Sequence, residues 1–266
     1  MLTSNIVDYF EENFGKQITL PAELFESVVE KDNPGILVDI MSILLKSSRG
    51  HCLIFSDEEE NESFYRTESM LIAKKLMETF QVDENSETKE SMGSTPKRKI
   101  IPVDVDLIIS KSLTSSERSL REFLSYVIDN DNNVVLFVDK FYLLSKEVFF
   151  SKNYPSYLRN LFYNAINRNR IQLLGYLSLK EFIELFNDEK KKYNSEYFEG
   201  VSIKNTEIEQ KMLILLKEIK KIYEKRYSIS MDDSCVDEVF TSVKNLKEFS
   251  KDPFARMNTM LEYKFL

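Results

Sequence analysis

The sequence predicts an α/β core followed by a small helical segment, and two observations support this prediction. Short apolar runs typical of buried strands alternate with helical patterns, an order that indicates a mainly parallel sheet covered on both faces. After Gly200 the strand signals stop, and amphipathic helical patterns continue to the end of the chain. We therefore expect a large α/β domain over residues 1–200 and a small helical lid domain over residues 201–266.

Apolar runs give the expected strands, and periodic patterns give the helices. The runs CLIF, IIPVDV, VVLFV and IQLL predict strands at 52–55, 100–105, 134–138 and 171–174. A capping box at Thr114 and Glu117 predicts a helix over 115–128. Further helices are expected over 206–227, over 232–246 and from an N-cap at Asp252 with Pro253 at N1. The polar stretch 83–99 predicts a mobile loop that interrupts one domain.

Composition excludes several function classes. With 44 acidic against 36 basic residues, the net charge is −8, which argues against a dedicated nucleic-acid binder. One histidine, His51, and two cysteines, Cys52 and Cys235, fall short of a structural zinc site, and we expect both thiols to be reduced and buried. The sequence shows neither a secretory signal nor an apolar run near the ~20 residues of a membrane span, so we expect a cytoplasmic protein without membrane contact.

Glycine is scarce, with six residues in the whole chain. A phosphate-cradling loop needs glycine, because only backbone without Cβ can curl its N–H groups closely around an oxyanion. The chain therefore has little material for such a loop.

Several strings, taken in order, resemble the first AAA+ module of the Clp-type unfoldases and disaggregases. They are YFEENFGKQIT at 9–19, PKRKIIPVDVDLII at 96–109, ERSLREFLSYVIDNDNNVVLFVD at 117–139, the run at 158–188 and EYFEGV at 196–201. The resemblance covers nearly the whole chain, and its specificity comes from collinearity. It implies a AAA+ P-loop-type parallel sheet with flanking helices and a small C-terminal helical lid.

The motifs that the resemblance assigns to ATP chemistry are degenerate. The family has a loop of the form G-x-x-x-x-G-K-[ST], and this chain has SDEEENESFYRTES, in which Arg66-Thr67 is the candidate remnant of the lysine and hydroxyl pair. About five negative charges would surround a triphosphate there, which costs several kcal/mol even at an effective dielectric of ~20. This argues against ordinary binding of ATP.

The other catalytic positions that the resemblance assigns have also changed. Asp139 keeps the magnesium-side carboxylate of the Walker B strand, but Lys140 replaces the glutamate that polarises water; we favour a surface pair between them without a role. Sensor 1 falls at Leu177 or Ser178, and a serine hydroxyl could still donate. Glu196 and Tyr197 stand where the family has its paired arginines.

Two further positions can be compared with the family. The substrate-threading loop of the family carries an aromatic residue, but the corresponding residues 110–114 contain none. Arg256 lies near a sensor-2 position but is more simply an exposed helix arginine. Eight aromatic residues between 141 and 163 form either core, which we favour, or a partner surface. They are Phe141, Tyr142, Phe149, Phe150, Tyr154, Tyr157, Phe162 and Tyr163.

Three hypotheses follow. The first is a pseudo-ATPase that acts as scaffold, adaptor or regulator in protein quality control, with a protein partner such as an active Clp-type ATPase or its protease and without a cofactor or metal. The second is a nucleotide-responsive subunit, active only in a mixed complex, in which Arg66, Thr67, Asp139 and Ser178 contribute to an ATP-Mg²⁺ site. The third is a non-catalytic clamp-loader-type AAA+ subunit. Homo-oligomerisation stays open.

Overall fold

The computed structural model describes residues 12, 15–46, 50–56, 60–82, 98–110, 118, 121, 122, 124, 125, 134–145, 165, 171–187, 198–245 and 252–266. The described strands form one five-stranded sheet, all parallel, in the order β2-β3-β4-β1-β5. They are β1 (His51–Ser56), β2 (Lys99–Pro102), β3 (Val134–Val138), β4 (Gln172–Ser178) and β5 (Phe198–Ile203). The predicted α/β class is confirmed.

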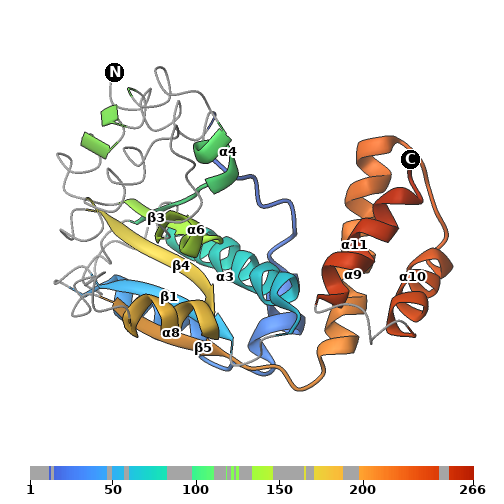
Figure 1. Ribbon diagram of the computed structural model, residues 1–266, viewed down its shortest axis with the longest axis horizontal. Helices are drawn as coiled ribbons and strands as arrows, with labels where there is room; N and C mark the ends of the chain where they lie inside the picture. The colour runs from blue at the N-terminus through green and yellow to red at the C-terminus, as the bar shows by residue number, and fades with distance from the viewer. Residues whose placement is uncertain are drawn as a thin grey trace.

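Helices cover both faces of the sheet and continue beyond it (Figure 1). Those associated with the sheet are η1 (Glu26–Glu30), α2 (Ile36–Leu44), α3 (Glu62–Val82), α4 (Val105–Ser110), α6 (Phe141–Ser145) and α8 (Leu179–Asn187). Three more lie together beside it, with the C-terminus among them: α9 (Ile208–Tyr227), α10 (Ser234–Lys244) and α11 (Pro253–Tyr263).

Successive side chains of a strand point to opposite faces of the sheet, and this divides the core into two clusters. On β4, Leu174 and Tyr176 pack into a cluster with α2 and α3, whereas Leu173 and Leu177 pack into the opposite cluster with α6 and α8. The first cluster continues into α9, α10 and α11 through buried side chains such as Phe254. One continuous apolar core therefore joins the helical segment to one face of the sheet.

The second predicted strand is shorter than expected. It ends at Pro102, and α4 begins at Val105, so the expectation of a strand to residue 105 was wrong. The Asp104 side chain accepts a hydrogen bond from the Leu107 amide at 3.0 Å, which caps α4 and stops the strand. Lys99 already belongs to β2, so the predicted loop ends earlier, and its residues 83–97 lie outside the described chain.

The sequence did not predict β5, which is an edge strand. Its central residues are only partly covered, and Glu199 and Gly200 weaken the apolar pattern. Gly200 is needed at this point, because a Cβ there would lie 2.8 Å from the ring of Phe55. This glycine thus serves sheet packing on the neighbouring strand.

Other local predictions had mixed outcomes. Cys52 is buried and free, but Cys235 is free and only partly buried, so the expectation of two buried thiols was half wrong. Burial raises the pKa of the Cys52 thiol. The helix predicted over 115–128 lies mostly outside the described chain, although the residues described within it are helical and Leu124 is buried.

Candidate functional site

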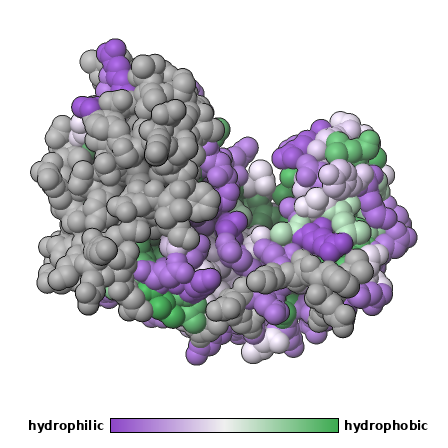
Figure 2. All heavy atoms as spheres, in the orientation of Figure 1, coloured by the Kyte–Doolittle hydropathy of each residue, from purple (hydrophilic) through white to green (hydrophobic). Residues whose placement is uncertain are grey.

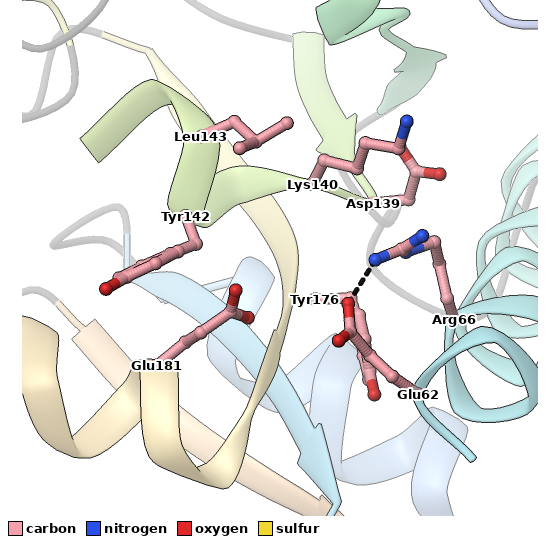
Figure 3. A pocket seen from close by; sticks show the side chains of 8 residues that line it. All are labelled: Glu62, Arg66, Asp139, Lys140, Tyr142, Leu143, Tyr176 and Glu181. Atoms are coloured by element: carbon pink, nitrogen blue, oxygen red, sulfur yellow. Dashed lines mark hydrogen bonds and ion pairs between the residues drawn. The ribbon is translucent and has the colours of Figure 1, made fainter. Parts of the chain in front are cut away.

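A cavity of 290 Å³ lies beyond the carboxyl ends of β1, β3 and β4, the edge at which parallel sheets usually bind ligands (Figure 3). This volume is at the lower limit of about 300 Å³ for small-molecule pockets. Its lining combines three acids and two bases with aromatic and apolar side chains. The lining residues are Glu62, Arg66, Asp139, Lys140, Tyr142, Leu143, Tyr176 and Glu181.

The turn between β1 and α3 keeps the spacing of a phosphate-binding loop. From Ser56 at the end of β1 to Ser63 in the first turn of α3, the eight residues SDEEENES match the length of G-x-x-x-x-G-K-[ST]. Asn61 falls at the second glycine and has φ 64°, the left-handed conformation that glycine adopts freely and asparagine tolerates. Glu62 therefore stands at the lysine position and Ser63 at the hydroxyl position.

Arg66 and Thr67 lie one turn further into α3 than these two positions. Arg66 forms an ion pair with Glu62, and the dashed line in Figure 3 marks this contact beside the cavity. The Thr67 hydroxyl donates to the Ser63 carbonyl at 2.8 Å. Both candidate remnants of the lysine and hydroxyl pair are thus engaged within their own helix. Sequence reasoning counted Glu62 among the acidic residues of this turn but assigned neither Glu62 nor Asn61 to a position of the motif. Counting eight residues from the end of the strand would have done so.

Asp139 is buried, with 2% of its side chain exposed, and it forms an ion pair with Lys16. Lys16 belongs to the segment that precedes the sheet, and its backbone amide donates to the Pro102 carbonyl at 2.9 Å. The interpretation of Asp139 and Lys140 as a surface pair was therefore wrong. Lys140 pairs with Asp106 of α4, and the Lys16 ammonium group is the cation that neutralises Asp139.

Ser178 ends β4 and begins α8 as a capping box with Glu181. Its hydroxyl accepts from the Glu181 amide at 3.3 Å, and its own amide donates to the Glu181 carboxylate at 3.0 Å. Burial raises the pKa of Glu181 above its ordinary value, although the Ser178 amide opposes that rise. Both side chains therefore serve the start of α8.

The two described members of the aromatic cluster, Phe141 and Tyr142, belong to the core, as we favoured for the cluster. Phe141 is 1% and Tyr142 is 8% exposed, and both pack against the cluster of α6 and α8. The Tyr142 hydroxyl donates to Glu184, and burial raises the pKa of this phenol. The other six residues of the aromatic cluster lie outside the described chain.

A second cavity, of 370 Å³, lies between α3, α9 and α11. Figure 2 shows a hollow between the helical segment and the rest of the molecule. The two cavities share no lining residue. On α3, Glu62 and Arg66 line the first cavity, whereas Ser63 and Thr67 line the second. Between the cavities, the Ser63 amide donates to the Asp252 carboxylate at 2.9 Å. The N-terminus of α3 therefore divides the two cavities.

Several expected positions add little to the site. Arg256 is exposed on α11 and lines neither cavity, as expected for a helix-surface arginine. Glu196, Tyr197 and 111–114 lie outside the described chain. Among the described residues, no cluster of histidine, cysteine or acidic side chains could hold a metal ion. In that same part of the chain, no helix combines the length and apolarity that crossing a bilayer requires.

Comparison with known proteins shows the fold. No protein-family model matches the chain, and no curated protein does so either. The S. cerevisiae Hsp104–ADP complex is similar over 86% of this chain and 36% of its own, with a TM-score of 0.54 and 12% identity. The extended S. cerevisiae Hsp104:casein complex is similar over 96% of this chain and 41% of its own, with a TM-score of 0.56 and 11% identity.

A closed-state Hsp104 structure with ATPγS and FITC casein is similar over 96% of this chain and 42% of its own, with a TM-score of 0.57 and 11% identity. The chain thus spans about two fifths of the Hsp104 chains that it matches. Its fold is that of a AAA+ module, as the sequence resemblance implied.

Proposed function

We propose that this chain is a pseudo-ATPase: a AAA+ module without catalysis that acts as a scaffold, adaptor or regulator in protein quality control. The observation that carries the proposal is Glu62, a carboxylate at the position where the phosphate-binding motif has lysine. A phosphate brought to the start of α3 would meet this negative charge instead of an ammonium group. The fold shared with Hsp104 supports the link to protein quality control.

The remaining charges of the site support the same proposal. The carboxylate that would face magnesium, Asp139, is neutralised by Lys16, and the Ser178 hydroxyl caps α8. Lys140, at the position of the water-polarising glutamate, is paired with Asp106. Loss of a general base alone lowers rates by ~10²–10⁴, so the described residues give no route to rapid hydrolysis.

Isothermal titration calorimetry with ATP-Mg²⁺ tests the proposal directly. We expect no saturable binding up to about 1 mM, because the start of α3 presents carboxylates to the phosphates. Glu62→Gln is the matched variant, since it removes the charge and keeps the side-chain size. Micromolar binding by the wild-type chain, accompanied by release of phosphate, would contradict the proposal.

The proposed partner is a protein, either an active Clp-type ATPase or its protease. Affinity purification from the native cell, followed by mass spectrometry, tests this part. Recovery of such an ATPase or protease at stoichiometric levels would support the scaffold role, and its absence at high bait recovery would argue against it.

The nucleotide-responsive subunit is a second candidate, because one cavity brings Arg66 and Asp139 together. It requires Lys16 to leave Asp139 when a partner and ATP-Mg²⁺ bind. This candidate predicts ATPase activity that appears only in the mixed complex and that disappears in Asp139→Asn.

A further inference from the structure

The Asp252 carboxylate contacts the N-termini of two helices. One oxygen accepts from the Ala255 amide at 3.1 Å and caps α11, as the sequence predicted. The other accepts from the Ser63 amide at 2.9 Å, in the first turn of α3. Residues 63 and 252 are far apart in sequence, so this single side chain links the helical segment to the turn that follows β1.

The Ser63 amide is the type of group that a phosphate normally uses. The first N–H groups of a helix have no intrahelical partner and carry the positive end of the helix dipole, so they attract anions. By the spacing from Ser56, Ser63 is the hydroxyl position of the phosphate-binding motif. Asn61 supplies the positive φ that lets the chain turn into α3. A carboxylate of the same chain therefore occupies a phosphate-type position.

We propose that Asp252 substitutes for a phosphate group at the start of α3 and fixes the helical segment in place without a nucleotide. Apolar packing reinforces the contact, because Phe64 of α3 and Phe254 of α11 meet edge to face with ring centroids 5.7 Å apart. An added anion reaches the Ser63 amide only when Asp252 leaves it. The inference goes beyond the pseudo-ATPase proposal, since the contact exists whether or not the chain binds a protein partner.

Substitution of Asp252 by serine separates the two roles of this side chain. Serine caps helices about as well as aspartate, so Asp252→Ser preserves the start of α11. Its single short oxygen cannot bond both amides, so the link to Ser63 is lost. Asp252→Asn is the second variant: its oxygen can cap α11, whereas its amide nitrogen is a donor and cannot accept from Ser63.

Amide hydrogen exchange, followed by nuclear magnetic resonance on the full chain, reads the contact at one residue. In the wild-type chain we expect a protected Ser63 amide, although a first-turn amide lacks an intrahelical partner. In both variants its exchange should quicken by roughly 10- to 100-fold, the range for loss of a hydrogen bond to a charged group. Exchange at Met257 and Leu261 in α11 should stay unchanged.

Two outcomes would overturn the proposal. One is a Ser63 amide that exchanges equally fast in the wild-type and variant chains. The other is a rise in exchange spread evenly through α11, which would show that Asp252 acts only as its cap. Neither outcome depends on ATP titration, so failure here leaves the pseudo-ATPase proposal standing, and the reverse also holds.

Discussion

The cavity at the carboxyl ends of the strands and the junction between β5 and α9 both contain charged residues, but they hold them differently. At the cavity, Arg66 and Lys140 are partly exposed and their carboxylate partners are exposed. Asp139 is buried there, but its partner Lys16 is 28% exposed. At the junction, the side chains of Lys211, Asp32 and Glu68 are 3%, 8% and 0% exposed. Buried charges depend on their partners much more than exposed charges do.

The junction network fixes the backbone that leads from the sheet to α9. Lys211 Nζ lies 2.7 Å from the Asp32 carboxylate and 4.0 Å from that of Glu68. Asp32 also accepts from the Thr206 amide at 2.9 Å, and Asn33 accepts from the Lys204 amide at 2.7 Å. Of the two regions, the junction therefore buries more charge, and this charge holds the helical segment to the sheet.

Removal of the buried lysine should have the largest effect. Lys211→Met leaves the buried Asp32 carboxylate without the cation 2.7 Å from it and removes the charge 4.0 Å from Glu68, which should lower the free energy of unfolding by about 3–5 kcal/mol. Lys244→Met is the control, because its pair with Glu209 is exposed and should be worth at most about 1 kcal/mol. Urea unfolding measures both variants. Equal losses would show that burial adds nothing to the contribution of Lys211.

The second-largest effect should come from lowering the pH, which weakens the contribution of Asp32 to the junction. The Lys211 ammonium group, followed by the Thr206 amide and hydroxyl, lowers the pKa of Asp32 from 3.8 to about 2. Because the folded-state pKa is depressed, its contribution is complete above the unfolded value and disappears as the pH falls towards 2. The stability difference between wild type and Asp32→Asn should shrink by on the order of 2 kcal/mol between about pH 5 and pH 2. A difference that is constant with pH would contradict this assignment.

Local sequence patterns predicted the parts of the fold that local forces determine. The bounds of β3 matched, because five consecutive apolar residues are buried on both faces of the sheet. The Asp252 cap was also foreseen, since a cap depends on neighbouring residues. Its second bond, to Ser63, spans 189 positions, and the Lys16–Asp139 pair spans 123. A single sequence carries no signal for such distant contacts, so the internal partners of the site could not be predicted.

The smallest effect should come from Ser178, which contacts the cavity-lining residue Glu181. Ser178→Ala removes the hydroxyl that caps α8 and should cost about 1 kcal/mol of unfolding free energy, whereas Ser178→Thr should restore most of it. Ser42→Ala is the control, because that exposed hydroxyl donates only to the Asp39 carbonyl of its own helix, at 2.7 Å. If Ser178 instead contacted a nucleotide, the alanine variant would lose an ATP-dependent shift in melting temperature while its stability without ATP stayed unchanged. A cost that is independent of ATP would assign this hydroxyl to the scaffold. A cost smaller than that of Lys211→Met would show that the cap of α8 contributes less to stability than the junction does.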